Sequence, residues 1–438
     1  MSIDAFQACA RFGLGPRPGE IATVAGDPRG WLLSQLQRPS IPKEVAGFAG
    51  RSEATEAFLA RLEARKTKEN VEAAALGIRQ AYIKETGTRL VAQVRSDQPF
   101  IERLVLFWSN HFTVSVQKPV IAALVNRFEV EAIRPYVTGR FADMLKAVAS
   151  HPAMLLYLDN AQSFGPNSLA GQRRNRGLNE NLAREILELH TLGVDGGYTQ
   201  TDVIAFAKIL TGWTLQARDR ATFAFQPRAH EPGAHQLLGR SYGAGDMNDG
   251  LRALDDLARH PATARHIAVK LARHFIADDP PPDAVAQLAE VFRQSDGNLA
   301  TVSRTLVEMK ASWQEPLTKV KTPYEFAVSA LRLTAIEPTP EQAIVGLAGL
   351  NFRPFGALSP AGFADTASGW ISADAVLKRI EWSRALALRL PPQVDPKDLA
   401  AQSIGPVMRE DTRFVIAGAA SGRDGMALLL ASPEFQRR

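Results

Sequence analysis

Apolar residues recur every three or four positions along most of the chain, and this period constrains the fold more than any other feature. It is the spacing of a helix that buries one face and exposes the other. The stretch 100–110 is the clearest example, because Ile101, Leu104 and Trp108 would lie on one side of a helix. The pattern predicts a mainly α fold, built as a multi-helix globular array.

One segment instead has the features of a small sheet. Residues 222–225 and 236–239 are short apolar runs, and they flank a turn-rich stretch that holds Pro232 and Gly233. Two short runs on either side of such a stretch are typical of a β-hairpin. We therefore expect one small β-hairpin near residues 222–240.

The chain of 438 residues is long enough for several structural units, since a domain usually takes roughly 100–200 residues. Its most polar long stretch, residues 52–97, has apolar residues spaced for one buried stripe, which predicts a charged helical hairpin over the core. We divide the chain into N-terminal helices with this hairpin (1–97), a core helical domain with the candidate site and the small β-hairpin (98–277), and a C-terminal helical region packed on that core (278–438).

The charge balance and the apolar runs exclude some classes of protein. Lys and Arg number 51 against 46 Asp and Glu, a net charge of +5, whereas nucleic-acid binders usually gather a basic surplus on one face. No segment reaches the ~18–20 apolar residues of a transmembrane helix. The first residues lack the features of a signal peptide. We expect a cytoplasmic protein with no nucleic-acid partner and no transmembrane segment; export together with a partner stays open.

A helix predicted over residues 179–192 carries the most informative polar face. At ~100° per residue, four unlike polar side chains fall within one sector beside an apolar one: Asn181, Arg184, Glu185 and Glu188. Two carboxylates three positions apart point the same way, which suits divalent-metal binding or acid–base chemistry. The same spacing also fits an exposed polar face in which Arg184 pairs with Glu180 and Glu188.

Histidines supply two further candidate positions. Asn110 and His111 end the apolar helix, where the imidazole would either line a pocket with the asparagine or interact with the last carbonyl groups of the helix. His230, Glu231 and His235 lie in the expected β-hairpin, and such side chains can fill three positions of a zinc site. Their spacing matches no established motif, so the two histidines are weak metal candidates against the alternative of an exposed loop.

Other histidines and motifs point away from familiar chemistry. His266, Lys270 and His274 repeat every four positions, a basic stripe more typical of a solvent-facing helix than of phosphate binding. A di-iron site of the Glu-x-x-His type is excluded for the 179–192 helix, because position 187 is a leucine. The sequence also has no G-x-S-x-G, Walker, H-E-x-x-H or strand-linked G-x-G-x-x-G motif.

Short blocks in a fixed order run along nearly the whole chain. They are RFGLGP (11–16), LFWSNHF (106–112), HPAML (151–155), NENLARE (179–185), ELHTLG (188–193), TQTD (199–202), LTGWT (210–214) and HPA (260–262). In their order and spacing, these blocks resemble the bacterial domain-of-unknown-function 1800 family.

The resemblance implies little about chemistry, because the family has no established activity and no agreed catalytic residues. It implies that members often occur beside proteins similar to sulfatases and alkaline phosphatases, which suggests a shared pathway. Many members carry an export signal, and this chain departs from them in that respect. The blocks also contain most of the polar candidates, namely Asn110, His111, Asn179, Asn181, Arg184, Glu185 and Glu188.

These observations lead to a first hypothesis, an enzyme with one polar pocket. The catalytic candidates, as proton-transfer groups or metal ligands, are His111, Glu185 and Glu188. The substrate-binding candidates are Asn110, Asn181, Arg184 and Trp213. The reaction would be a metal-assisted hydrolysis or an oxidation of a small polar or anionic substrate, with a divalent metal as the expected cofactor. The neighbours implied by the resemblance suggest a carbohydrate-related substrate.

The second hypothesis is a non-catalytic accessory or assembly partner of a sulfatase-like or alkaline-phosphatase-like protein. It follows from the absence of a nucleophile motif in the sequence and from the implied neighbours. In this case the 52–97 hairpin and the basic stripe would be docking surfaces, and the polar face at 179–192 would be a buried structural network.

Overall fold

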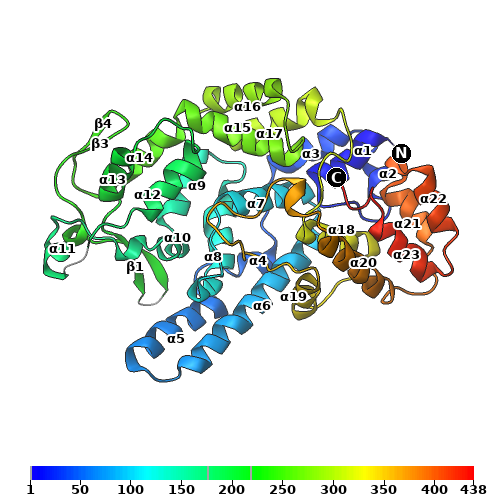
Figure 1. Ribbon diagram of the computed structural model, residues 1–438, viewed down its shortest axis with the longest axis horizontal. Helices are drawn as coiled ribbons and strands as arrows, with labels where there is room; N and C mark the ends of the chain where they lie inside the picture. Colours follow the sequence, from blue (N-terminus) through cyan, green and yellow to red (C-terminus); the bar gives the residue numbers. More distant parts are fainter. Residues whose placement is uncertain (1, 175–176, 218–219) are drawn as a thin grey trace.

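Helices packed along an elongated body make up most of the structure (Figure 1). The computed structural model describes residues 2–174, 177–217 and 220–438. The prediction of a mainly α fold is confirmed. No helix within these ranges combines the length and the apolar character needed to cross a membrane.

The N-terminal part of the chain forms short helices and then a long helical pair. The elements are α1 Ile3–Gln7, α2 Glu20–Val24, α3 Pro28–Gln37, α4 Lys43–Ala46, α5 Glu53–Thr67 and α6 Val71–Arg95. Ser52 caps α5, since its hydroxyl accepts a hydrogen bond from the backbone N–H of Thr55 at 3.3 Å. The pair α5 and α6 projects from the body as a hairpin (Figure 1).

The middle of the chain forms the centre and one end of the body. Its helices are α7 Pro99–His111, α8 Val125–Phe128, α9 Phe141–Ser150, α10 Pro152–Tyr157, α11 Leu169–Arg174, α12 Asn181–Glu185, α13 Gln200–Ile209, α14 Met247–Ala258, α15 Pro261–Phe275, α16 Pro282–Gln294 and α17 Leu299–Glu308. Segments of π-helix occur at Ala8–Phe12, Glu129–Ile133 and Ile186–Thr191. Such segments are rare, and they are frequent at functional sites.

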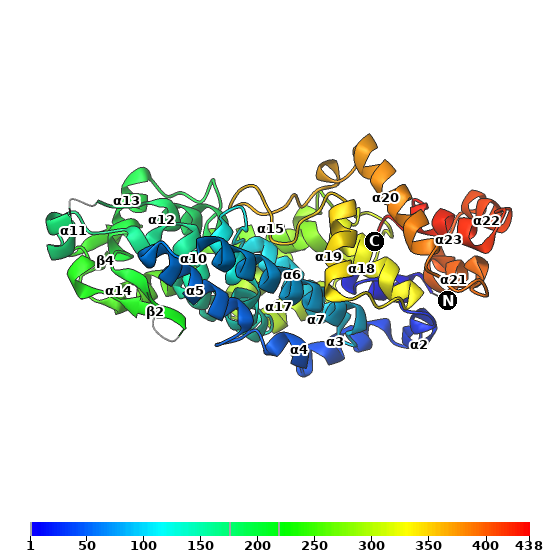
Figure 2. The same cartoon turned by 90° about the horizontal axis from the view of Figure 1, so that it is seen from below.

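Helices from both ends of the sequence meet at the other end of the body. The C-terminal elements are α18 Pro323–Thr334, α19 Pro340–Gly349, α20 Ala373–Ala387, α21 Pro396–Ser403, α22 Glu410–Ala417 and α23 Gly422–Ala431. Ala5 and Phe6 of α1 share an apolar core with Leu430 and Phe435. Figure 2 shows α2 beside α21 at this end. The core there is therefore assembled from residues separated by nearly the whole chain.

The larger core surrounds α7. Phe100 and Trp108 of this helix are buried, as the apolar period predicts. The ring of Phe12 lies 5.8 Å from that of Phe100, and Trp313 stacks on Phe12 at 5.0 Å between ring centroids. Such aromatic pairs add directional contacts to the burial of apolar area. This packing holds α7 firmly in place, and the polar residues at its C-terminal end are held with it.

Sheet structure is limited, in the described part of the chain, to two antiparallel pairs. One pair is β1 Trp213–Ala217 with β2 Ala221–Phe225, and the other is β3 His235–Leu237 with β4 Arg240–Tyr242. The single hairpin expected near residues 222–240 is thus replaced by two hairpins between nearest neighbours. Leu238 and Gly239 have φ angles of 49° and 75°. Positive φ at both positions makes a tight turn where the residue pattern predicts the end of a strand.

A long irregular segment, residues 350–372, joins α19 to α20, and we call it the strap. Apart from a 3-10 turn at Ala367–Gly369, the strap has no helix or strand. Irregular loops of this length are uncommon in compact domains and are often functional. Figure 1 shows the strap crossing the body beside α7.

Candidate ligand-binding site

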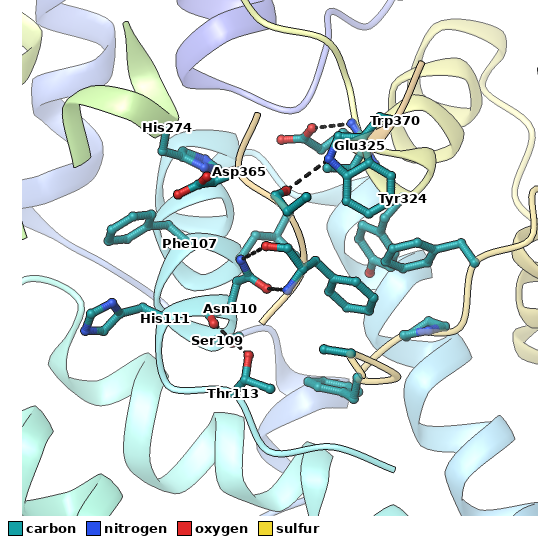
Figure 3. Close-up of a pocket in the computed structure, with 18 of the residues that line it drawn as sticks. Phe107, Ser109, Asn110, His111, Thr113, His274, Tyr324, Glu325, Asp365 and Trp370 are labelled. Carbon is teal, nitrogen blue, oxygen red and sulfur yellow. Dashed lines mark hydrogen bonds between the residues drawn. The ribbon is translucent and has the colours of Figure 1, made fainter. Parts of the chain in front are cut away.

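A cavity of about 120 Å³ lies between α7, α15, the start of α18 and the strap (Figure 3). Space of this size fits a molecule with on the order of ten non-hydrogen atoms. Its lining combines aromatic rings with charged groups, among them Phe107, Lys270, His274, Lys319, Tyr324, Glu325, Phe363, Asp365, Trp370 and Arg438.

Asn110 fastens the strap to the end of α7 (Figure 3). Its Nδ2 donates a hydrogen bond to the backbone oxygen of Phe363 at 3.1 Å, and the N–H of Phe363 donates to its Oδ1 at 2.8 Å. Gly362 has a φ of +85°, and a Cβ there would lie 2.6 Å from the carbonyl oxygen of Asn110. Only glycine allows this close approach. Asn110 lines the cavity, and its amide positions the strap. Its role in substrate binding stays a prediction.

His111 also lines the cavity, but its ring points away from the strap (Figure 3). Nε2 lies 3.2 Å from the carbonyl oxygen of His190. Nε2 therefore carries the proton and donates it to this bond, and Nδ1 has no partner among the described residues. Burial lowers the pKa of His111 well below its usual value, and the charges of His266 and His190 lower it further. The imidazole is neutral and joins α7 to the segment that contains His190.

Lys270 and His274, one helical turn apart on α15, line the cavity from another side. Lys270 Nζ lies 3.0 Å from the carboxylate of Asp365 in the strap. The ring of His274 packs edge-on against Phe107 at 5.3 Å, and its Nε2 has no hydrogen-bond partner in the described part of the chain. Burial, and next the charge of Arg438, holds the pKa of His274 well below its usual value. The interpretation of this stripe as solvent-facing is therefore wrong.

Glu325, in the first turn of α18, is a buried carboxylate that also lines the cavity. It forms ion pairs with Arg103 and, at 3.2 Å, with Arg438. Its other oxygen accepts a hydrogen bond from the N–H of Thr322 at 2.7 Å. Burial alone would raise the pKa of Glu325, but Arg438 and Arg103 hold it well below its usual value. Burial and repulsion by Arg438 lower the pKa of Arg103 to about 9. Positive charge thus outweighs negative charge here.

Aromatic side chains of the strap form the apolar wall of the cavity. The ring of Phe363 lies 4.8 Å from that of Phe352 and 6.2 Å from that of Trp370. Trp370 Nε1 donates a hydrogen bond to the backbone oxygen of Ala364 at 3.0 Å, which holds the indole within the strap. Ligand pockets usually pair such apolar surface with a few placed polar groups, and this cavity has both.

The polar face predicted over residues 179–192 lies outside this cavity. Asn181 is exposed. Arg184 pairs with Glu180 at 2.8 Å and donates a hydrogen bond to Gln200 at 2.9 Å. The Glu180–Arg184 pair is the one expected for an exposed polar face, so the structure does not bring Asn181 and Arg184 together with Asn110.

Glu185 and Glu188 are half-buried on the same segment. Burial, and next the charge of Glu188, raises the pKa of Glu185 above its usual value. The hydroxyl of Tyr198 donates a hydrogen bond to Glu188 at 3.3 Å. The structure thus brings these two carboxylates together, but apart from the strap and the cavity. Their catalytic role stays a prediction.

The helix that carries this face changes form part-way along. It is α-helical over Asn181–Glu185 and π-helical over Ile186–Thr191. Because a π-helix has more residues per turn, a wheel drawn at 100° per residue fails beyond the first segment. His190 lies in the π segment, where it is buried as a core histidine, and neither ring nitrogen has a partner among the described residues. Burial lowers the pKa of His190 to about 3.

The remaining predicted residues lie in the region of the two hairpins. Trp213 is fully buried, packs against Phe223 with ring centroids 5.2 Å apart and lies outside the cavity. Its role in substrate binding stays a prediction. His230 is buried, and its Nδ1 lies 2.9 Å from the carbonyl oxygen of Thr211. His235 lies in β3. Within the described ranges, no three His, Cys, Asp or Glu side chains are arranged to hold a metal ion.

Several lining residues are absent from the candidates predicted from the sequence. The sequence does mark Glu325, because Thr322 and Glu325 have the spacing of a capping box that starts a helix. No sequence pattern marks Lys319 or Asp365, because neither belongs to a segment with a helical period. Their place in the site depends on how α15, the residues before α18 and the strap pack together.

The chain matches the family model described as "Protein of unknown function (DUF1800)" over residues 7–437, which is nearly its whole length. No curated protein and no solved structure matches it. The match agrees with the resemblance carried by the sequence blocks. The chain therefore belongs to the DUF1800 family, whose function is unknown.

Proposed function

We propose that this chain is an enzyme that binds a small anionic, ring-bearing molecule beneath the strap. One observation carries the proposal: Lys270, Lys319 and Arg438 line the same small cavity as His274, whose Nε2 lacks a partner among the described residues. The cations favour an anionic ligand, and the aromatic wall of the strap favours a flat or ring-shaped body. Perturbed titratable groups in a partly apolar cavity are typical of active sites.

His274 is the side chain best suited to proton transfer in this cavity. Its imidazole is neutral while no ligand is bound, because burial and the charge of Arg438 lower its pKa more than the charge of Glu325 raises it. The negative charge of a bound ligand raises the pKa of a neighbouring imidazole. Nε2 then accepts a proton from a substrate hydroxyl, and Lys270 stabilises the negative charge that develops on the substrate oxygen.

Replacement of His274 by glutamine tests this assignment. A panel of sugar acids and sugar phosphates is first tested for its effect on the thermal unfolding midpoint of the wild-type chain. For the members that raise it, we expect His274→Gln to weaken affinity roughly tenfold, the worth of one hydrogen bond to a charged partner. Turnover of the same compounds should be lost. Calorimetric titration measures the affinity.

His235→Gln is the matched control, because His235 is a half-buried histidine outside the cavity. It should bind the same compounds with wild-type affinity. The proposal is contradicted if no compound in the panel raises the unfolding midpoint, or if the His274 and His235 variants bind and turn over these compounds equally well.

A second candidate function is that of an accessory partner for a sulfatase-like protein. Exposed apolar side chains on α20 and α22 favour it, since Val376, Leu377 and Phe414 are open to solvent. Exposed apolar groups of this kind are often protein contacts. Tagged chain co-expressed with a sulfatase-like gene neighbour should retain that protein on purification, and Phe414→Ser should reduce the recovery. If the two proteins form no complex at micromolar concentration, this function is contradicted.

A further inference from the structure

The strap places its own carboxylate among the cations of the cavity. An oxygen of Asp365 lies 3.0 Å from Lys270 Nζ and 3.6 Å from the guanidinium of Arg273. The backbone oxygen of Asp365 also accepts a hydrogen bond from Lys319 Nζ at 2.8 Å. One residue of the strap therefore contacts three cations that belong to the helical body.

The carboxylates at this point do not balance the cations. Lys270, Arg273 and Lys319 bring three positive charges, whereas Asp365 and Asp278 bring two negative ones, the latter through an ion pair with Lys319. The side chains of Lys270, Lys319 and Asp365 are mostly buried, whereas those of Arg273 and Asp278 are about a third exposed. Uncompensated charge is costly at the buried positions. A group with two negative charges in place of the Asp365 carboxylate would complete the balance.

The contacts that hold this part of the strap are side-chain contacts and not secondary structure. Asn110 holds Phe363, and Asp278 accepts a hydrogen bond from the N–H of Ala367 at 2.7 Å. Between these two anchors, the side chain of Asp365 is held by the ion pairs with Lys270 and Arg273. The carboxylate can leave the cations without disrupting a helix or a strand.

We propose that Lys270, Arg273 and Lys319 form a subsite for a phosphoryl group, and that Asp365 fills this subsite while no ligand is bound. The inference rests on the proposed function, because it places the anionic end of the ligand. A phosphoryl group carries roughly −1.5 to −2 charge at pH 7. It thus neutralises the subsite better than the single charge of Asp365, which it displaces toward solvent, and the middle of the strap is released.

The test is the binding of inorganic phosphate to the full chain, measured by calorimetry. Asp365→Asn removes the internal competitor and nearly keeps its shape, so phosphate should bind about tenfold more tightly than to the wild type. Asp374→Asn is the matched control, because Asp374 pairs with Lys378 at 2.7 Å on the exposed face of α20. It should leave phosphate affinity unchanged. Lys270→Met should weaken phosphate binding in both the wild-type and the Asp365→Asn background.

Binding of acetate tests whether the charge of the anion decides its affinity for the subsite. Acetate carries one negative charge, and it should bind the Asp365→Asn variant more weakly than phosphate does. Equal phosphate affinity of the wild type and the Asp365→Asn variant would overturn the proposal, and so would tighter binding of acetate than of phosphate.

A second measurement uses the wild-type chain alone, in case the Asp365 variant folds poorly. Phosphate should speed chymotrypsin cleavage after Phe363 or Trp370 in the strap, compared with sodium chloride of equal ionic strength. Unchanged cleavage in phosphate overturns the proposal. Phosphate binding of the expected kind without turnover of any organic anion contradicts the proposed enzyme and leaves the subsite in place. If organic anions bind and turn over but Asp365→Asn does not change phosphate affinity, the phosphoryl subsite is contradicted and the proposed enzyme stands.

Discussion

Replacement of Glu325 by glutamine should destabilise the fold by about 3–5 kcal/mol, the cost of removing one partner from a buried ion pair. Glu325 is 5% exposed, and it pairs with Arg103 and Arg438, which are 1% and 3% exposed. Glutamine keeps the shape, and its carbonyl oxygen can keep the hydrogen bond from Thr322, so the loss reports the charge together with the hydrogen bond accepted from Arg103. Urea unfolding followed by tryptophan fluorescence measures the change in the free energy of unfolding.

The control for this variant is Glu308→Gln on α17. Glu308 forms an exposed pair with Arg304 at 3.8 Å, and exposed pairs contribute roughly 0–1 kcal/mol. The Glu325 variant should lose more free energy of unfolding than the Glu308 variant. Equal losses would contradict the surplus of buried positive charge, which is the reason for expecting an anionic ligand.

Replacement of Glu85 by glutamine should instead stabilise the protein at alkaline pH by about 3 kcal/mol. Glu85 lies on α6, where it is 5% exposed, and burial raises its pKa to about 7. Glutamine is neutral at every pH and is close in shape.

The direction of the pH effect follows from the number of protons that the native and the unfolded chain bind at Glu85. Between pH 4.5, the usual pKa of a glutamate, and pH 7, the native chain keeps the proton of Glu85, whereas the unfolded chain has lost it. The contribution of Glu85 to the free energy of unfolding therefore falls over this range and levels off above it. Buried histidines, whose pKa values are lowered, contribute with the opposite sign, so the effect of Glu85 is the difference between the variant and the wild type at each pH. Unfolding measured from pH 4 to 9 should show the Glu85 variant and the wild type equal at the acid end and apart above pH 7.

Glu56→Gln controls for the loss of a carboxylate on the same hairpin, since Glu56 is exposed and pairs with Arg51. Its difference from the wild type should not change with pH. Parallel pH profiles for the Glu85 variant and the wild type would show that this carboxyl group titrates as it does in water.

Much of the fold follows from the apolar period, because each helix of this kind buries one side. Residues 100–110 read as a helix, and α7 Pro99–His111 is that helix. The hairpins show the limit of the same reasoning. The turn between β3 and β4 places Leu238 at positive φ, which its residue type does not suggest, so the strand pairs could not be predicted correctly.

The site was predictable only where its residues lie on regular helices. Asn110 and the stripe of Lys270 and His274 stand out by position and spacing, but a helical wheel does not show what packs against a face. Asp365 lies in a segment without periodicity, so its approach to Lys270 follows only from the packed structure. The wheel for the helix over residues 179–192 groups Glu185 with Glu188, as the structure does, but it does not show that this face lies away from the cavity.

The apolar core shared by Ala5, Phe6, Leu430 and Phe435 has a consequence for synthesis on the ribosome. The first helix emerges from the ribosome long before the residues that complete its burial. Its apolar face therefore stays exposed to solvent while translation continues. Long-range contacts of this kind slow folding and expose nascent chains to aggregation. We therefore expect newly made chains to need a chaperone until the last helices are released.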